Sequence, residues 1–281
     1  MPSDRVGDTP YLSSGAILPS DAFMSIVALP YELDSVQRLR EQDLEEARTI
    51  QGVMLPAQPL CSASVMISHE FQPAAAVGGD YLDYFSLPDG TFGMYIGDVS
   101  GKGLPACLYA ALAVGTLRGI HKTGCHPSRV LYLLNQRLLL RGIPGRHTAI
   151  QYALFDPRTA ELSVASAGMP GPMLLRGEEL QVLQVAGIPP GLFPDVTYDV
   201  LNVQLVPGDS VLFFTDGLTD ARNVQDEDFD VKGLKEVCYS HAGESRIELL
   251  GHIFGAIEEF CRNCQQWDDM TAAVFHYSGP E

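Results

Sequence analysis

Aspartates recur in this chain at positions where a predicted strand ends or begins. Asp98 closes the run FGMYIGD, and Asp216 closes the run SVLFFTD. Asp80 precedes a short predicted strand, and Asp268 stands with Asp269 immediately before the strand TAAVFHY. Because the end of one antiparallel strand lies beside the start of its neighbour, these four segments are expected to meet at one edge of the fold. Glycines near these aspartates allow tight turns there.

Carboxylates gathered at one edge repel one another unless cations bind between them. Donor sets made only of oxygen select hard ions, so Mg²⁺, Mn²⁺ and Ca²⁺ are the candidates. A pair of such ions commonly serves a displacement at phosphorus. Any single aspartate next to a glycine is ordinary turn chemistry, and the prediction therefore depends on the four strand-terminal positions taken together.

The elements between these aspartates are predominantly β. Apolar alternation or short apolar runs between turn residues predict strands at 65–71, 92–97, 148–155, 161–167, 172–175, 200–205, 210–215 and 271–277. Helical spacing predicts helices at 105–118, from 127 to about 142 and from 245 to about 264. Strands in runs and helices in pairs indicate an α+β fold, in which an antiparallel sheet core is covered by helices.

The N-terminal part of the chain has a different character. Residues 1–34 are mixed and have no clear period, and we predict an irregular segment there. Residues 35–58 are predicted to form a linker helix, since apolar residues recur at helical spacing from Val36 to Met54 before Pro56. This 35–55 helix either packs on its own domain or joins a second copy in a homodimer, and both interpretations stay open. The main domain is then residues 59–281.

Composition restricts the class of protein further. The chain has 281 residues, 46% hydrophobic and 19% charged, as in ordinary globular proteins. Its net charge of −17 disfavours binding to nucleic acid or to an anionic membrane. The six cysteines contain one CxxC pair, Cys261 and Cys264, which is not enough for a zinc site. With no secretory signal and an apolar stretch at 104–117 too short for a bilayer, we expect a cytoplasmic protein.

The spacing of the residues argues against several other kinds of active or binding site. The segment from Gly101 to Ala106 fits G-x-G-x-x-A, but no acidic residue lies between Asp98 and Asp156 to hold a ribose. The same region is one residue short of a P-loop, and Gly103 stands where a hydroxyl would hold Mg²⁺. No cysteine is followed six positions later by the arginine of a cysteine phosphatase, and the histidines show no metal-binding spacing.

The segments GGDYLD, GDVSGKG, FFTDGLTDARN and WDDMT together resemble the ordered motifs of the SpoIIE-like branch of PPM-type metal-dependent serine/threonine phosphatases. Order, spacing and context match over about residues 45–277, including the helical segment LEEARTIQGVMLP. The resemblance implies an α-β-β-α architecture with an antiparallel β-sandwich core. The segment SAGMPGPMLL departs from the pattern, because Met169 stands where the family usually has histidine, and GIPPGL is a variant turn.

The resemblance also implies a specific metal centre. Asp98 would bridge two divalent ions, Mn²⁺ or Mg²⁺, with the Val99 carbonyl as a further ligand. Asp216 and Asp268 would complete one ion, and Asp80 would help to hold the other, partly through water. A water activated by the two metals would attack phosphorus in line, without a covalent phosphoenzyme.

Partners follow from the same resemblance. The substrate would be phosphoserine or phosphothreonine on a small regulatory protein, often an antagonist of an anti-sigma factor. The helices after GDVSGKG and the 35–55 helix would serve in activation by a partner or by dimerisation, and Asp269 would support the ligands from behind. Two alternatives are a catalytically silent signalling scaffold and a Ca²⁺-binding structural domain. The first is disfavoured because none of the four aspartates is missing, and the second because no D-x-D-x-D-G loop occurs.

Overall fold

The structure is a computed structural model that describes residues 20–121, 124–241 and 246–280. The chain divides after Leu44 into two compact units, residues 1–44 and residues 45–281. Helix α1 (Ser20–Met54) begins before residue 35, so residues 20–34 are helical where their sequence context predicts irregular structure. The stretch 20–34 contains no glycine, and the Gly- and Pro-rich composition belongs to residues 1–19, which lie outside the described part.

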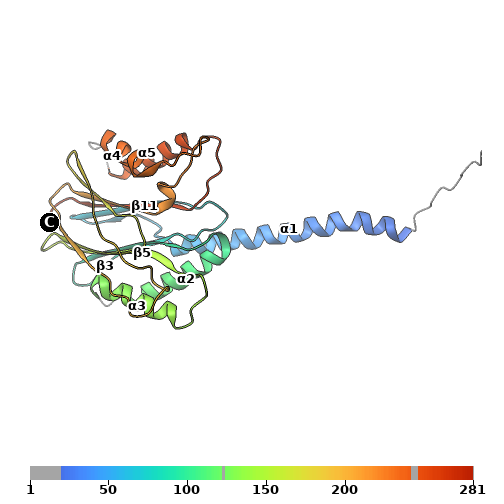
Figure 1. Cartoon of the computed structure of the whole chain (residues 1–281), viewed down its shortest axis with the longest axis horizontal. Coiled ribbons are helices and arrows are strands. Elements are labelled where there is room, and N and C mark those ends of the chain that lie inside the picture. The colour runs from blue at the N-terminus through green and yellow to red at the C-terminus, as the bar shows by residue number, and fades with distance from the viewer. Residues whose placement is uncertain (1–19, 122–123, 242–245, 281) are drawn as a thin grey trace, which may run out of the picture. The chain divides into compact units, whose positions relative to one another are not determined.

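In the described residues, the strands form two antiparallel sheets that stack face to face (Figure 1). The first sheet has the order β1 (Leu60–Cys61), β2 (Val65–Gln72), β11 (Met270–Tyr277), β10 (Ser210–Phe214), β7 (Met173–Arg176) and β8 (Glu179–Val182). The second sheet has the order β3 (Tyr81–Ser86), β4 (Phe92–Val99), β5 (Thr148–Asp156), β6 (Glu161–Ala167) and β9 (Leu201–Gln204). The strands predicted from apolar patterning are all present.

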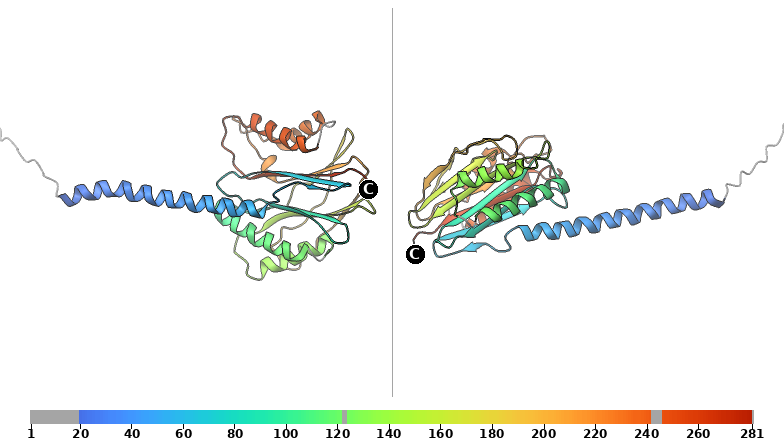
Figure 2. Two further views of the ribbon diagram at one scale, coloured as in Figure 1. Left: turned by 180° about the vertical axis from the view of Figure 1, so that it is seen from behind. Right: turned by 90° about the horizontal axis from the view of Figure 1, so that it is seen from below.

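Pairs of helices cover the outer faces of the two sheets. Helices α2 (Gly103–Ile120) and α3 (Pro127–Leu139) lie on the second sheet, and α4 (Asp230–Ser240) and α5 (Arg246–Phe260) lie on the first (Figures 1 and 2). This helix–sheet–sheet–helix order confirms the predicted α+β fold with an antiparallel sandwich at its centre. A short 3₁₀ turn, Asp216–Leu218, follows β10 directly.

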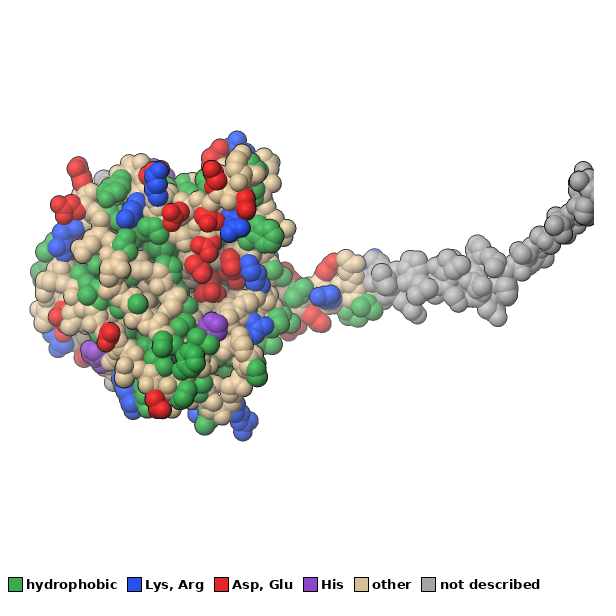
Figure 3. Space-filling model, viewed as in Figure 1, with side chains coloured by type: hydrophobic (Ala, Val, Ile, Leu, Met, Phe, Trp, Pro, Cys, Tyr) green, Lys and Arg blue, Asp and Glu red, His purple; other side chains and the backbone are tan. Residues whose placement is uncertain are grey.

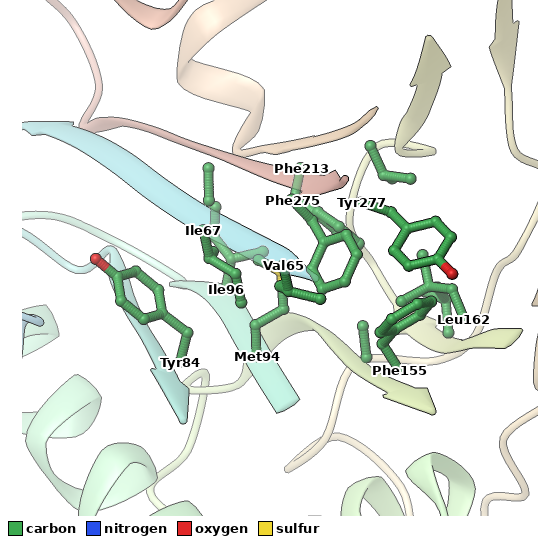
Figure 4. Packing of buried hydrophobic residues seen from close by; sticks show 14 of the residues in the cluster. Val65, Ile67, Tyr84, Met94, Ile96, Phe155, Leu162, Phe213, Phe275 and Tyr277 are labelled. Atoms are coloured by element: carbon green, nitrogen blue, oxygen red, sulfur yellow. The ribbon is translucent and has the colours of Figure 1, made fainter. Parts of the chain in front are cut away.

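The central core lies between the two sheets, where aromatic and aliphatic side chains from both inner faces interdigitate (Figure 4). The ring of Phe155 from the second sheet lies 5.1 Å from Phe275 and 5.0 Å from Tyr277 of the first, measured between centroids. Strand β10 is buried at every position, because Val211 and Phe213 face the opposite sheet while Leu212 and Phe214 face the helix layer. This explains why its sequence is a continuous apolar run.

Helix α2 is nearly all apolar and carries alanines where it meets the second sheet. Ala106, Ala110 and Ala113 are buried beside the sheet, and their small side chains let the helix approach closely. Among the described residues, α2 alone has the length and hydropathy of a membrane-crossing helix. Its buried face packs on β3, β4 and α3, so its apolar character already serves the core of this domain.

Candidate metal centre

The aspartates at the strand ends come together in pairs, one pair from each sheet. In the second sheet Tyr81 pairs with Gly97, which places Asp80 opposite Asp98. In the first sheet β10 and β11 are paired up to Phe214, so that Asp216 follows β10 at the end where residues 268–269 lead into β11. The antiparallel argument therefore predicts each pair correctly.

Asp80 joins the two sheets. Its carboxyl is 1% exposed, and Oδ2 accepts hydrogen bonds from Thr215 Oγ1 at 2.8 Å and Thr271 Oγ1 at 2.6 Å, both on the opposite sheet. The Thr271 N–H donates in turn to Thr215 Oγ1 at 3.0 Å. The sequence motifs did not reveal these threonines as site residues, although hydroxyls at buried positions next to the aspartates of FFTD and DDMT were an available signal.

Mutual repulsion and burial shape the protonation of the cluster. The pKa of Asp98 is raised to about 7, first by burial and then by the charges of Asp216 and Asp268, while a hydrogen bond with the Asp80 carboxyl lowers it. The pKa of Asp80 is also raised, by burial first and by Asp98 next. Asp216 reaches solvent, and its pKa is raised by partial burial and by repulsion from Asp220 and Asp268. The cluster thus carries more negative charge than its own surroundings neutralise.

One ammonium group lies against this cluster. Lys102 Nζ is 3.1 Å from Asp268 Oδ2, with 53% of the lysine side chain and 44% of the aspartate side chain exposed. The same ammonium donates to the backbone carbonyl of Trp267. Figure 3 shows acidic side chains gathered on this face with basic ones beside them. A divalent ion that enters here would compete with Lys102 for the Asp268 carboxylate.

The donor chemistry of these residues fits hard divalent ions, since carboxylates and a backbone carbonyl are the oxygen ligands that Mg²⁺ and Mn²⁺ prefer. Gly79 leaves space beside the Val99 carbonyl, because a Cβ at residue 79 would lie 3.0 Å from that oxygen. Within the described residues, however, no three acidic, histidine or cysteine side chains already enclose an ion. Ion binding therefore requires these side chains to turn toward one another, as their repulsion is relieved.

Asp269 has a different environment from its neighbour Asp268. It is 5% exposed, and its Oδ1 accepts from the Ala74 N–H at 2.8 Å while its Oδ2 accepts from the Gly79 N–H at 2.6 Å. A Cβ on Gly78 would collide with the same carboxylate, which explains the glycine at that position. Because both oxygens bind backbone amides of the 74–79 loop, Asp269 supports the loop that leads into Asp80.

Two residues noted in the sequence motifs lie away from the centre. Asp83 accepts from Arg118 Nε at 2.8 Å, and Arg118 also donates to the Met54 carbonyl at 2.8 Å, so this ion pair ties β3 to α2 and to the end of α1. Met169, which stands at the position of the family's usual histidine, is 8% exposed and belongs to the core between the sheets.

A pocket of about 450 Å³ opens beside Asp268. It lies between the segment 220–222 and the end of α5, and Arg222, Arg262 and Trp267 are among its lining residues. Trp267 is 68% exposed. The pocket therefore has both polar and apolar walls, and the candidate metal ligand Asp268 is one of its lining residues.

The four-layered arrangement of two sheets between two helix layers is also found in solved PP2C domains. The SiaA PP2C domain of Pseudomonas aeruginosa superposes with a TM-score of 0.78 at 24% identity, covering 87% of this chain and 99% of that domain. At this identity the similarity shows the fold. The family model for stage II sporulation protein E (SpoIIE) matches residues 88–278, more than half of the chain, and the protein therefore belongs to the SpoIIE family.

Characterised relatives include the phosphoserine phosphatase RsbU of Bacillus subtilis, which is 25% identical over 272 residues. The alignment covers 92% of this chain and 80% of RsbU. Protein IcfG of Synechocystis sp. is 28% identical over 273 residues, which cover 85% of this chain and 41% of IcfG. The chain thus spans less than half of IcfG, and most of RsbU.

Proposed function

We propose that this protein is a Mg²⁺- or Mn²⁺-dependent phosphatase that hydrolyses phosphoserine or phosphothreonine on a regulatory partner protein. The observation that carries the proposal is the convergence of Asp80 and Asp98 from one sheet with Asp216 and Asp268 from the other. Burial and mutual repulsion raise the pKa values of Asp80, Asp98 and Asp216, which supports a site whose negative charge lacks neutralisation. The name of RsbU, a phosphoserine phosphatase, supports the same reaction class.

In this proposal Asp98, Asp216, Asp268, Asp80 and the Val99 carbonyl hold two ions. Such ions, when bound, activate a water for in-line attack on phosphorus and neutralise the phosphate oxygens. The protein's own residues orient the metal ligands. Thr215 and Thr271 hold the Asp80 carboxyl by hydrogen bonds, and Asp269 holds the loop that precedes Asp80.

The substrate must reach the strand ends as part of a folded or extended protein segment. The pocket beside Asp268 offers room for residues that flank the phosphorylated side chain, and its rim carries an exposed indole and two guanidinium groups. Aromatic and arginine side chains are frequent anchors in protein–protein contacts. We place the substrate's flanking residues on this surface.

Hydrolysis of an aryl phosphate and of a phosphoserine peptide, with Mn²⁺, Mg²⁺ or chelator, tests the proposal. Turnover that requires the metal and disappears in Asp98→Asn supports it. A folded protein that binds no Mn²⁺ and hydrolyses neither compound would instead be a phosphatase-fold scaffold. Turnover with Ca²⁺ equal to that with Mn²⁺ would contradict the assigned ions.

We also propose that residues 59–281 are the catalytic domain, that residues 35–58 are a linker, and that the 35–55 helix joins a second copy in a homodimer. Within α1, Ile50 is 59% exposed and Val53 is 75% exposed, which is unusual for apolar side chains on a helix that packs only on its own domain. Sedimentation of the wild type and of Val53→Glu tests this: a dimer that the substitution dissociates is expected, and a wild-type monomer at high concentration contradicts it. We further propose a cytoplasmic location, and the net charge of −17 disfavours binding to nucleic acid or to an anionic membrane.

A further inference from the structure

A single glutamine on helix α1 is buried where its neighbours are exposed. Among the side chains described between residues 36 and 55, Gln51 alone is buried, at 3% exposure. The adjacent Ile50 and the nearby Val53 are exposed. A polar side chain loses its hydration on burial, so it is placed inside only where specific partners replace the water.

Both polar atoms of the Gln51 side chain bind the backbone of one residue. Its Nε2 donates to the Gly78 carbonyl at 2.8 Å, and its Oε1 accepts from the Gly78 N–H at 3.1 Å. The side-chain amide therefore makes the same two hydrogen bonds to Gly78 that a residue of a neighbouring strand would make, donating one and accepting one. No other amino acid side chain of this size presents a donor and an acceptor in the same arrangement, and glutamate would oppose the Gly78 carbonyl with a second oxygen.

The peptide unit between Gly78 and Gly79 is consequently held at both of its ends. Its carbonyl accepts from Gln51, while its N–H donates to Asp269 Oδ2 at 2.6 Å. Gly79 itself lies against the Val99 carbonyl, and the next residue is Asp80. A displacement of this peptide would shift Asp80 and would change the space beside the Val99 oxygen at the same time.

We propose that Gln51 is a positioning residue for the metal centre. Its amide holds the Gly78–Gly79 peptide and thereby sets the position of Asp80 and of the space beside the Val99 carbonyl, two groups that are expected to hold the ions. This inference rests on the proposed function. Supporting groups behind metal ligands typically change metal affinity by 10- to 100-fold when they are replaced, and the same range is expected here.

The test compares Gln51→Met, which keeps the length and helical preference of the side chain but has no hydrogen-bonding amide, with Gln37→Met. Gln37 is an exposed glutamine on the same helix whose Nε2 donates to Glu41 Oε1 at 3.3 Å, and it serves as the matched control. Mn²⁺ binding to the full chain is measured by calorimetry, and aryl phosphate turnover is measured over a range of Mn²⁺ concentrations. Near-ultraviolet circular dichroism establishes that each variant is folded.

Gln51→Met is expected to weaken Mn²⁺ binding at one of two sites by at least about tenfold. At saturating Mn²⁺ its kcat and its KM for the aryl phosphate should return to within about threefold of the wild type. Gln51→Glu should weaken Mn²⁺ binding at least as strongly, and Gln37→Met should leave it unchanged. Wild-type Mn²⁺ affinity in a folded but less stable Gln51→Met protein would reduce Gln51 to a purely structural role and overturn the inference.

Hydrogen exchange on the wild type provides a measurement that does not depend on a variant folding. The Gly78 amide should exchange much more slowly than an exposed loop amide, because it donates to a buried side chain. Rapid exchange at Gly78 would overturn the inference. Failure of the proposed function appears differently, as a wild-type protein that binds no Mn²⁺ at all.

Discussion

Replacement by alanine should affect different properties at the neighbouring residues Asp268 and Asp269. At Asp269 it should lower the stability of the fold, and at Asp268 it should lower the affinity for Mn²⁺. Replacing Asp269 by alanine leaves the buried N–H of Gly79 and the half-buried N–H of Ala74 without their acceptor. A buried donor that loses its partner costs about 1–3 kcal/mol and a half-buried one costs less, while loss of the Asp269 charge relieves some repulsion on Asp80 and Asp98. The variant should therefore lose about 1–4 kcal/mol of unfolding free energy. Domains are stable by only about 5–15 kcal/mol in total, which makes this a large fraction.

Asp268→Ala removes much less stabilisation. The side chain is partly exposed, and its ion pair with Lys102 is of a kind worth about 0–1 kcal/mol at a surface. The substitution also removes a negative charge that raises the pKa values of Asp98 and Asp216, and this offsets part of the loss. A change of less than about 1 kcal/mol, in either direction, is therefore expected.

Urea unfolding in the presence of chelator separates these effects from metal binding, and calorimetry with Mn²⁺ completes the comparison. We expect Asp269→Ala to be strongly destabilised without metal, whereas Asp268→Ala keeps its stability and loses Mn²⁺ affinity. Asp269→Asn should lie between, because one amide oxygen still accepts while the NH₂ group faces a backbone donor. Wild-type stability of Asp269→Ala, or a destabilised Asp268→Ala with normal Mn²⁺ affinity, would refute the roles assigned to the two residues.

Three further outcomes are expected. In the folded protein Asp98 keeps its proton up to about pH 7, whereas an unfolded aspartate keeps its proton only up to about pH 4. Between these values the folded state binds more protons, so the stability of the chelated protein should fall as pH rises. Urea unfolding at pH 5 and pH 8 would show this loss. Lys102→Met should bind Mn²⁺ at least as tightly as the wild type, by calorimetry, because a competing ammonium is gone from Asp268. Thr271→Val removes one donor from the buried Asp80 carboxyl and should cost about 1–3 kcal/mol in thermal or urea unfolding.

Each of these outcomes has a clear opposite. Chelated protein that gains stability from pH 5 to pH 8, or an Asp98→Asn variant with the same pH dependence as the wild type, would contradict the repulsion among the carboxyls. Weaker Mn²⁺ binding in Lys102→Met would mean that the lysine assists the ion. A fully stable Thr271→Val protein would show that Thr215 alone satisfies Asp80.

The strand ends that carry the aspartates were predictable because long apolar runs stop at a charged residue, which fixes both the element and its boundary. Helix α4 and strands β1 and β8 were missed. Helix α4 buries only Leu234 and Cys238, β1 has only two residues, and β8 alternates between exposed and half-buried positions, so these sequences carry little apolar signal. The early start of α1 was missed because the residues before it dominate the composition of the N-terminal segment.

The site was predictable within each sheet and not between the sheets. Antiparallel pairing brings Asp80 beside Asp98 whatever the rest of the fold does. The contact of Asp80 with Thr215 and Thr271 depends on how two sheets pack, and no local period encodes it. The same holds for Gln51, which in sequence is one polar residue among many on a charged helix and becomes distinctive only through a loop 27 residues away.

The exposed indole beside the metal centre provides a natural optical probe. Trp267 is the only tryptophan in the chain, it adjoins Asp268, and its carbonyl accepts the Lys102 ammonium that a metal would displace. All tryptophan fluorescence of the protein therefore originates within a few residues of the proposed ligands. Paramagnetic Mn²⁺ should quench this emission where diamagnetic Mg²⁺ only shifts it, so ion loading and the arrival of a substrate are both readable without a label.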